Sequence, residues 1–415
     1  MAERLWQNLS TNNSAFMDNS QTQATPTRPP KISLTRKIVF TTMSLILFVG
    51  VCEFTFKAIG FDFSKLGRDL EATPIFYRIP TEPFGRAHYK RPGDQQWTGR
   101  VVSAQMQKIG YDAKWLPQEE VITLSYDADG FRNPADLKSW RVVMLGDSFT
   151  ELGNLSDEEL VSTKLGKLLG QTVKNLGVSH TGLVNQTEYL REFGISPETK
   201  EVVWVFFEGN DIQDYVMESD RVASIQTGAT QHVDLLKTHV PQTSLIEAIQ
   251  RKLFSKSRLE IYGPAVNATL ADGTTQFKID YAPPRQDDIF PYLLRVESGI
   301  VTLAELCKAN ELQLTCVYMP CKRRAFSGHQ YTVADDAPAY LRNKWVPSDL
   351  PDWLQTVCRK NGMRFVDVTA ALLELNESEL LSHNLHFDTH LTAEGATVVS
   401  QTIAISLQSP TGSPP

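Results

Sequence analysis

The fold prediction starts from one stretch, Val142-Val143-Met144-Leu145-Gly146-Asp147-Ser148-Phe149-Thr150. Its apolar beginning is typical of a strand in a parallel sheet that is covered on both faces. Gly146 has no Cβ and therefore permits a sharp turn after the strand. Ser148 then lies at the carboxyl edge of the sheet, where open α/β sheets bind ligands. A serine in this place acts as a nucleophile only when a base removes its proton and hydrogen-bond donors stabilise the oxyanion.

Two further strand-like runs end in polar turns that contain glycine. Thr172 to Val178 includes Asn175-Leu176-Gly177, and Glu201 to Phe207 leads into Glu208-Gly209-Asn210-Asp211. Helical patterns separate the strands, and this alternation favours a parallel sheet with right-handed crossovers. We therefore predict a doubly wound α/β domain over residues 141–407. Later strands are expected over 312–319 and 364–368, and helices over 156–169, 182–193, 296–309, 350–361, 369–375 and 392–407.

Several polar residues near the strand ends have structural interpretations. Ser156-x-x-Glu159 has the pattern of a capping box at the start of a helix. Asp147 and Asp211 are interpreted as loop residues that accept hydrogen bonds, and His383 as an ordinary loop histidine. Lys322-Arg323-Arg324 follows a predicted strand, and we interpret it as a solvated charge run, with contact to an anionic substrate as the alternative.

Three segments lie outside the regular alternation. Residues 60–140 are interpreted as an irregular lead-in that packs on the core along the sheet edge and forms one wall of the site. Residues 215–290 have weak periodicity and are predicted to be an insertion or cap, which would form a lid or carry substrate specificity. Residues 408–415 are predicted to be a disordered tail.

The N-terminal part predicts a membrane anchor. Residues 1–37 are polar at first, end in a basic cluster, and are predicted to be a disordered cytoplasmic tail. Residues 38–59 form an apolar segment in which Glu53 and Lys57 lie one helical turn apart and can pair. We predict an uncleaved signal anchor; the alternatives are a cleaved signal peptide and a buried soluble helix. Positive charges before the span place the remainder of the chain outside the cytoplasm, in the periplasm or cell envelope.

The composition and charge of the chain limit which partners it can bind. The chain has 415 residues and a formal net charge of −7, which argues against a nucleic-acid binder with its usual basic face. The cysteines lack metal-ligand spacing, so no metal site and no cofactor are predicted; disulfides and buried free thiols both remain open. They are Cys52, Cys307, Cys316, Cys321 and Cys358.

Four blocks occur in a suggestive order along the chain. They are Gly146-Asp147-Ser148-Phe149-Thr150, Gly177, Gly209-Asn210-Asp211 and Asp388-Thr389-His390. In this order and context the chain resembles the SGNH (GDSL-like) hydrolase superfamily over about residues 130–407, apart from the insertion. The resemblance implies a flavodoxin-like three-layer α/β/α fold with a parallel sheet, here preceded by an N-terminal transmembrane helix.

The resemblance also implies a role for each matching residue. Ser148 would be the nucleophile, His390 the base, and Asp388 the acid that holds the imidazole. The backbone N–H groups of Ser148 and Gly177 and the side-chain amide of Asn210 would form the oxyanion hole. These donors follow neighbouring parallel strands, whose carboxyl ends meet at one edge of the sheet.

One spacing departs from the common family pattern. The usual block is Asp-x-x-His, whereas Phe387 stands three residues before His390 and the acid stands two before it. The short Asp-x-His spacing is similar to that of the alginate-acetylation branch, whose members are extracytoplasmic and act on polysaccharide O-acetyl groups. His386 or an acid from the insertion is the alternative partner for the base.

The combined pattern predicts a membrane-anchored, extracytoplasmic serine esterase that works through an acyl-enzyme. Its substrate would be an acyl ester, with O-acetyl groups on a carbohydrate favoured over a lipid. Two alternatives share the fold: an O-acetyltransferase that modifies an exopolysaccharide, and a non-catalytic envelope binding protein.

Overall fold

The computed structural model describes most of the chain after residue 121 and parts of the region before it. The described residues are 33–59, 61, 79–81, 88–91, 93–99, 122–227, 244–246, 249, 267–279, 286–337, 339–342, 348–377, 379–386 and 389–409. The chain divides into two units, Met1–Ala58 and Ile59–Pro415. The predicted disordered segments 1–37 and 408–415 lie mostly outside the described residues, as does Asp388.

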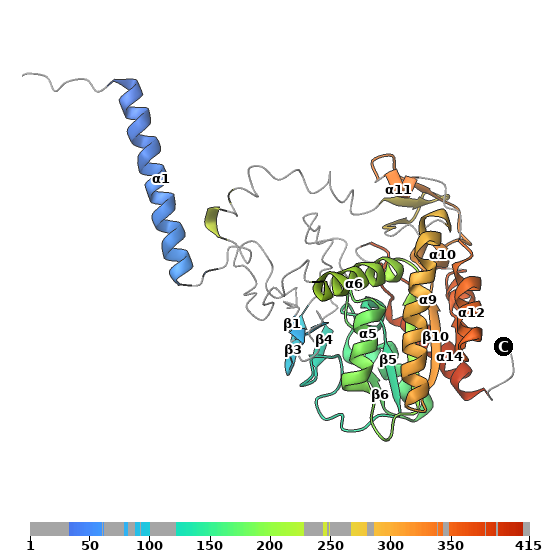
Figure 1. Ribbon diagram of the computed structural model, residues 1–415. Helices are drawn as coiled ribbons and strands as arrows, with labels where there is room; N and C mark the ends of the chain where they lie inside the picture. Colours follow the sequence, from blue (N-terminus) through green and yellow to red (C-terminus); the bar gives the residue numbers. More distant parts are fainter. Residues whose placement is uncertain are drawn as a thin grey trace, which may run out of the picture. The chain divides into compact units, whose positions relative to one another are not determined.

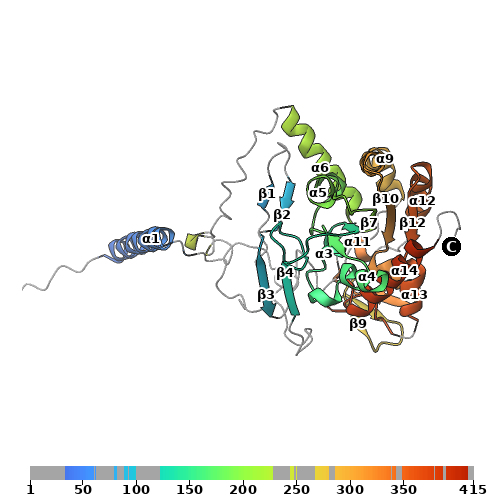
Figure 2. The ribbon, with the colours of Figure 1, turned by 90° about the horizontal axis from the view of Figure 1, so that it is seen from below.

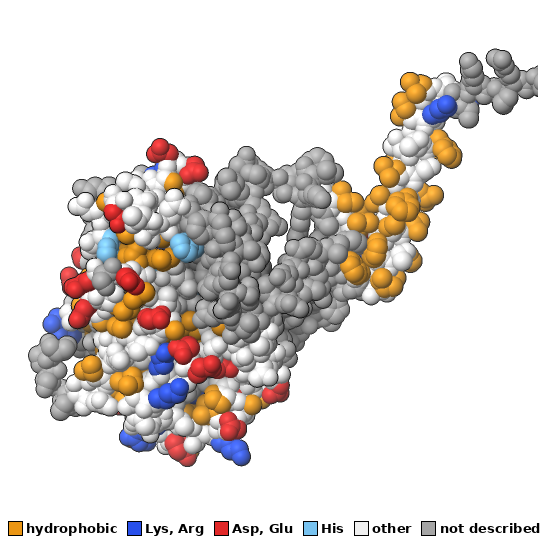
Figure 3. Space-filling view, turned by 180° about the vertical axis from the view of Figure 1, so that it is seen from behind, with side chains coloured by type: hydrophobic (Ala, Val, Ile, Leu, Met, Phe, Trp, Pro, Cys, Tyr) orange, Lys and Arg blue, Asp and Glu red, His pale blue; other side chains and the backbone are white. Residues whose placement is uncertain are grey.

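The first unit contains one long apolar helix, α1 (Leu34–Ala58). Its length and hydropathy are those of a helix that can cross a membrane, and none of its residues is buried in the protein. Apolar side chains cover its surface (Figure 3). Lys57 pairs with Glu53 at 3.3 Å, as the one-turn spacing predicts. The helix begins at Leu34 rather than at residue 38, so the last basic residues of the predicted tail belong to its first turns.

The second unit is built around a five-stranded parallel sheet (Figure 1). Its strand order is β12-β10-β7-β5-β6, which in chain order is the flavodoxin-like arrangement 5-4-3-1-2. The strands are β5 (Val142–Leu145), β6 (Val173–Asn175), β7 (Glu201–Phe207), β10 (Gln313–Met319) and β12 (Arg364–Asp367). The predicted fold class is therefore confirmed.

Helices cover both faces of this sheet (Figure 2). Because side chains alternate along a strand, Val142 and Met144 pack on one face and Val143 and Leu145 on the other. The first face carries α4 (Val161–Leu169), α13 (Thr369–Leu375) and α14 (Ala393–Gln408). The second carries α5 (Leu183–Tyr189), α9 (Gln286–Ala309) and α12 (Leu350–Lys360). All residues of β5 are fully buried, as its continuous apolar run predicts.

The predicted insertion is shorter than residues 215–290. Its first part continues the helix α6 (Asp211–Gln226), and its end belongs to α9, which begins ten residues before the predicted helix start. Between them, β8 (Ala268–Leu270) and β9 (Gln276–Phe277) form a small antiparallel sheet with β11 (Tyr331–Val333). Two short helices, α10 (Lys322–Ala325) and α11 (Ala339–Arg342), follow β10.

The lead-in contains more regular structure than expected. β1 (Ile79–Thr81) pairs with β2 (His88–Lys90), and β3 (Gln95–Gly99) pairs with β4 (Ile122–Tyr126), both antiparallel. The turn after β4 then enters the core, where the side chain of Phe131 is fully buried. Phe131 packs edge-on against the ring of Tyr189 in α5, with 5.3 Å between centroids.

Three local predictions are corrected or decided. The capping box is wrong, because the Ser156 hydroxyl accepts a hydrogen bond from the Thr123 N–H at 3.2 Å instead of capping its own turn. The Lys322-Arg323-Arg324 run is not solvated: Lys322 is fully buried, and Arg324 forms a two-armed ion pair with Glu208. All five cysteines are free thiols.

The Arg324–Glu208 pair gives a stability prediction. Arg324→Met leaves the fully buried Glu208 carboxylate without its guanidinium, so we expect the free energy of unfolding to fall by about 3–5 kcal/mol. Arg295→Met, the control, removes an exposed pair with Asp220 and should cost at most about 1 kcal/mol. Urea denaturation of the full chain in detergent, followed by tryptophan fluorescence, measures both. Similar losses in the two variants would contradict the assignment.

Candidate functional site

The Ser148 turn has the geometry that its sequence predicts. Ser148 is the first residue of α3 (Ser148–Glu151), a single helical turn directly after β5. Gly146 has φ of 155°, and a Cβ there would lie 2.2 Å from Thr150 Oγ1. Asp147 caps the turn, because its Oδ1 accepts a hydrogen bond from the Phe149 N–H at 2.9 Å. The hydroxyl of Ser148 is therefore presented at the carboxyl end of the strand.

The Ser148 hydroxyl donates a hydrogen bond to Asp147 Oδ2 at 3.2 Å. The Asp147 side chain is fully buried, and this burial raises its pKa. The Phe149 N–H and the charge of His390 oppose that rise. The histidine therefore lies within electrostatic reach of the carboxylate that holds the serine.

His390 lies on the loop that precedes α14. Its ring packs against the ring of Phe149, with 4.9 Å between centroids. The N–H of Asn384 donates to the carbonyl of His390 at 3.0 Å, and the Asn154 amide donates to the carbonyl of Leu391 at 2.9 Å. Asn154 follows α3, so these bonds fix the histidine loop to the segment that carries the serine. Asp388 lies outside the described residues.

A second histidine lies in the same aromatic cluster. The ring of His383 is fully buried between Phe149 and Phe326, at centroid distances of 6.3 and 5.9 Å. Its Nδ1 shares a hydrogen bond of 2.6 Å with the Ser382 hydroxyl. It is therefore a core residue and not an ordinary loop histidine. Its burial depends on residues from three distant segments, which no local pattern indicates.

Gly177 packs directly against the Ser148 turn. A Cβ on it would lie 2.5 Å from the Glu151 nitrogen and 2.7 Å from the Thr150 carbonyl carbon, so only glycine permits this contact. Its N–H donates to Asn175 Oδ1 at 2.8 Å. The structure thus brings Gly177 to the serine, while the single N–H that it offers is used within its own loop.

Asn210 reaches the site through a cluster of carboxylates. Its Nδ2 donates to Asp214 Oδ2 at 2.7 Å, which leaves a second amide hydrogen on the same atom. Oxygen atoms of Asp147, Asp211 and Asp214 all lie within 4.8 Å of one another, and all three residues are buried. Asp211 is the first residue of α6, and its Oδ2 accepts a hydrogen bond from the Phe207 N–H at 2.9 Å, which agrees with its interpretation as a structural residue that holds a strand end by hydrogen bonds.

The carboxylate cluster is suited to hold a proton. Burial and then the charge of Asp147 raise the pKa of Asp211 well above its ordinary value. A buried group of like charges relieves its repulsion when one member is neutral. The same oxygens are the ligands that a hard cation such as Mg²⁺ or Ca²⁺ prefers. Either a proton or such a cation would relieve the repulsion among the three carboxylates.

Glu151 is a buried residue of the site that the sequence pattern did not single out. Its carboxylate accepts hydrogen bonds from Arg91, Tyr126 and Ser179, which lie on three separate segments. Its place three residues after Ser148 is the one available signal, because that spacing returns to the same side of a helical turn. Nothing in the sequence shows its partners.

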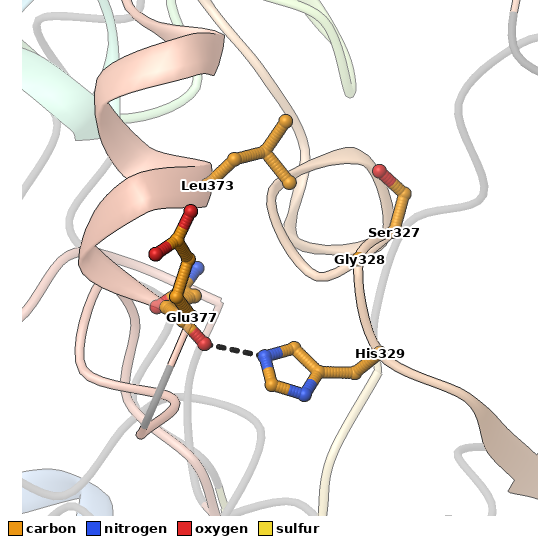
Figure 4. A pocket seen from close by; sticks show the side chains of 6 residues that line it. Ser327, Gly328, His329, Leu373 and Glu377 are labelled. Atoms are coloured by element: carbon orange, nitrogen blue, oxygen red, sulfur yellow. Dashed lines mark hydrogen bonds between the residues drawn. The ribbon is translucent and has the colours of Figure 1, made fainter.

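A cavity of about 500 Å³ lies away from Ser148 and His390, beside the C-terminal end of α13. It is lined by Ser327, Gly328, His329, Leu373, Asn376 and Glu377. The ring of His329 points across it and bonds through Nε2 to the carbonyl of Asn376 (Figure 4). The cavity is open and its residues belong to loop and helix ends, so we do not assign the reaction to it.

Comparison with known proteins adds similar structures but no similar sequence. No family model and no curated protein matches the chain. A lipolytic protein of the G-D-S-L family from Desulfitobacterium hafniense DCB-2 is 12% identical, covers 64% of this chain and 98% of its own, and has a TM-score of 0.34. The acetylxylan esterase Axe2 from Geobacillus stearothermophilus is 11% identical, with coverages of 66% and 96% and a TM-score of 0.34. A lipase/acylhydrolase from Enterococcus faecalis is 10% identical, with coverages of 65% and 95% and a TM-score of 0.33. The function proposed below therefore rests on this chain's own residues.

Glu218, beside the carboxylate cluster, gives a pH prediction. It accepts hydrogen bonds from the N–H groups of Gly182 and Asn185, at 2.7 and 3.2 Å, and burial raises its pKa from 4.5 to about 7. The folded protein therefore holds a proton that the unfolded chain has already released, so stability falls as the pH rises through this interval. The loss contributed by Glu218 at pH 8 is at most about 3 kcal/mol.

Glu218→Gln should remove this pH-dependent term. We expect the wild type to lose stability relative to the variant between pH 5 and pH 8, measured by urea denaturation at each pH. Asp220→Asn, which removes a carboxylate from the exposed side of the same helix, is the control. If the control shows the same change, the effect comes from net charge and the assignment to Glu218 is wrong.

Proposed function

We propose that the protein is a serine acyl esterase of the SGNH type, with Ser148 as nucleophile. One observation carries this proposal: the Ser148 turn and the His390 loop, distant in sequence, meet around Asp147 and the ring of Phe149. His390 supplies the base that a serine at a strand end needs. Asp388, two residues earlier, is proposed to orient the imidazole.

The chemistry follows from this arrangement. The Ser148 hydroxyl leaves Asp147 and gives its proton to His390, while the oxygen attacks the acyl carbon. The tetrahedral intermediate collapses, the bond to the alcohol breaks, and His390 returns the proton to the departing alkoxide. Water then gives a proton to His390 and attacks the acyl carbon, the bond to Ser148 Oγ breaks, and His390 returns the proton to Ser148, which releases the acid and the free enzyme.

The oxyanion hole is proposed to include the Ser148 N–H, the Gly177 N–H and the Asn210 amide. Asn210 has a second amide hydrogen in addition to the one given to Asp214, so it can donate without losing that bond. The Gly177 N–H is bonded to Asn175, and it must exchange that acceptor for the oxyanion. Each such donor contributes roughly 3–4 kcal/mol of transition-state stabilisation.

The proposed location and substrate class come from the N-terminal helix and the Asp-x-His spacing. α1 supports a membrane anchor, with the catalytic unit proposed to lie in the periplasm or cell envelope and O-acetyl groups on a carbohydrate proposed as its substrate. The spacing of Asp388 and His390 also favours a second function, transfer of the acyl group to a polysaccharide hydroxyl. The two functions share the acyl-enzyme and differ only in whether water or a sugar hydroxyl attacks it.

A fluorophosphonate probe tests the proposed nucleophile. The purified full-length protein should be labelled, and Ser148→Ala should abolish labelling, because Ser382, which also bonds to a histidine, is fully buried. His390→Ala should slow labelling by about 10²–10⁴-fold. Ser327→Ala, at an exposed serine, is the control and should label at the wild-type rate. A folded protein that is not labelled and does not hydrolyse p-nitrophenyl acetate would exclude the esterase; acylated product with an added oligosaccharide would identify the transferase.

Protease treatment of intact cells tests the proposed topology. Protease should cut the chain after Phe61 and spare the residues before α1, because the basic residues ahead of the helix hold that end in the cytoplasm. Immunodetection of tags at the two ends measures both fragments. Protection of the C-terminal tag both in intact cells and in spheroplasts, with cleavage only after lysis, would contradict the extracytoplasmic location.

A further inference from the structure

The helical turn that carries Ser148 is too short to be stable on its own. α3 has four residues and ends at Leu152, which has a left-handed φ of 45°. A single turn is not stable in water, because one or two hydrogen bonds do not offset the entropy of fixing its backbone. The position of the serine hydroxyl must therefore be set by contacts from elsewhere in the chain.

Arg132 provides one such contact from the segment that follows β4. Its side chain is buried and donates to the carbonyls of Leu152 at 2.7 Å and Leu155 at 3.0 Å. The Leu152 carbonyl lies at the end of the turn, where a helix leaves acceptors unsatisfied, and the Leu155 carbonyl lies three residues further on. The lead-in thus closes the C-terminal end of α3.

Glu151 provides the second contact and joins three segments. Its Oε1 accepts from Arg91 Nε at 2.8 Å and from the Tyr126 hydroxyl at 3.0 Å. Its Oε2 accepts from Arg91 Nη2 at 3.0 Å, from the Ser179 N–H at 2.6 Å and from the Ser179 hydroxyl. The side chain is 1% exposed, so water does not replace any of these bonds.

The charge of Arg91 keeps this carboxylate ionised. Burial alone would raise the pKa of Glu151, but Arg91 and then Ser179 outweigh it and lower the pKa to about 2. Ionisation matters because a carboxylate accepts hydrogen bonds on both oxygens, whereas a neutral acid has to donate one. The bond to the Ser179 N–H thus depends on a guanidinium sixty residues before Glu151.

These contacts meet where the proposed chemistry occurs. Ser179 lies two residues after Gly177, and Gly177 is already packed on the backbone of Thr150 and Glu151. By accepting hydrogen bonds from Ser179, the Glu151 carboxylate therefore sets how closely the Gly177 loop approaches the Ser148 turn. Displacement of such a pair by about 1 Å can cost on the order of 10²-fold in rate.

We propose that Glu151, charge-balanced by Arg91, is a positioning residue that fixes the Gly177 loop against the Ser148 turn, so that the catalytic unit begins at or before Arg91. This inference rests on the proposed function of Ser148 and goes beyond it. The lead-in then belongs to the active site and is not an accessory to a domain that starts at residue 141.

A double-mutant cycle in the full-length protein tests the proposal. The variants are Arg91→Met, Glu151→Gln and the two combined, with the rate of fluorophosphonate labelling measured from pH 4 to pH 9. We expect each single substitution to slow labelling by about 10–100-fold. The double variant should be no slower than the worse single one, because each residue acts through the other. Lys360→Met with Glu297→Gln, an exposed pair at 3.2 Å, is the control cycle and should leave labelling unchanged.

The pH profile separates positioning from a general loss of stability. In Arg91→Met the unpaired carboxylate is expected to take up a proton in the mildly acidic range, so labelling should fall there by more than protonation of His390 lowers it in the wild type. Arg91→Lys, which keeps the charge but has one donor group, should restore part of the rate. Labelling of folded Glu151→Gln at the wild-type rate, or single effects that multiply in the double variant, would overturn the proposal.

Amide hydrogen exchange keeps this test separate from the proposed function. Glu151→Gln should accelerate exchange of the Ser179 N–H relative to the amides of α4, and the control cycle should not. If the wild type is never labelled but exchange changes as expected, the esterase proposal fails and the positioning contact stands. If labelling occurs in the wild type and Ser179 exchange is unchanged in Glu151→Gln, the positioning proposal fails alone.

Discussion

Compensation of buried carboxylates is the constraint on which the carboxyl edge of the sheet depends. Asp147, Glu151, Glu208 and Asp211 all lie there with almost no exposed surface. Asp147 and Asp211 accept hydrogen bonds from backbone N–H groups, whereas Glu151 and Glu208 each pair with a guanidinium. Because a lone buried charge is costly, the loops can adopt few arrangements that satisfy all four together. The same demand fixes the serine turn, and it draws in arginines from outside the sheet.

The regular elements could be predicted because their causes are local. β7 and α13 have the bounds expected from their apolar patterns, and the five strands that build the sheet were all anticipated. Errors arose where a side chain found a distant partner. Ser156 bonds to Thr123 rather than to its own turn. In the basic run after β10, Arg324 pairs with Glu208 and Lys322 donates to the carbonyl of Leu385.

The residues of the candidate site could be predicted from the sequence, but the contacts that hold them in place could not. Ser148, Gly177 and His390 were named from short blocks, and the structure brings all three to one edge. Their support was not visible, because the contacts of Glu151 span separations of 25 to 60 residues without a repeating pattern. The hydrophobic period and the spacing of residues predict which side chains are neighbours along one helix or strand. They do not predict which distant segment packs against a buried acid.

The late position of the histidine loop affects the order in which the site is completed. Arg91, Tyr126 and Ser179 reach Glu151 within one stretch of chain, whereas the bond from Asn154 to Leu391 joins residues 237 apart. Long-range contacts of this kind close late in folding, because the intervening loop entropy must be offset first. Because the chain is made from its N-terminus, the Ser148 turn is therefore in place before the His390 loop exists. In the proposed esterase, reactivity would then appear only with the last helix, and the unfinished protein would be protected from acylation.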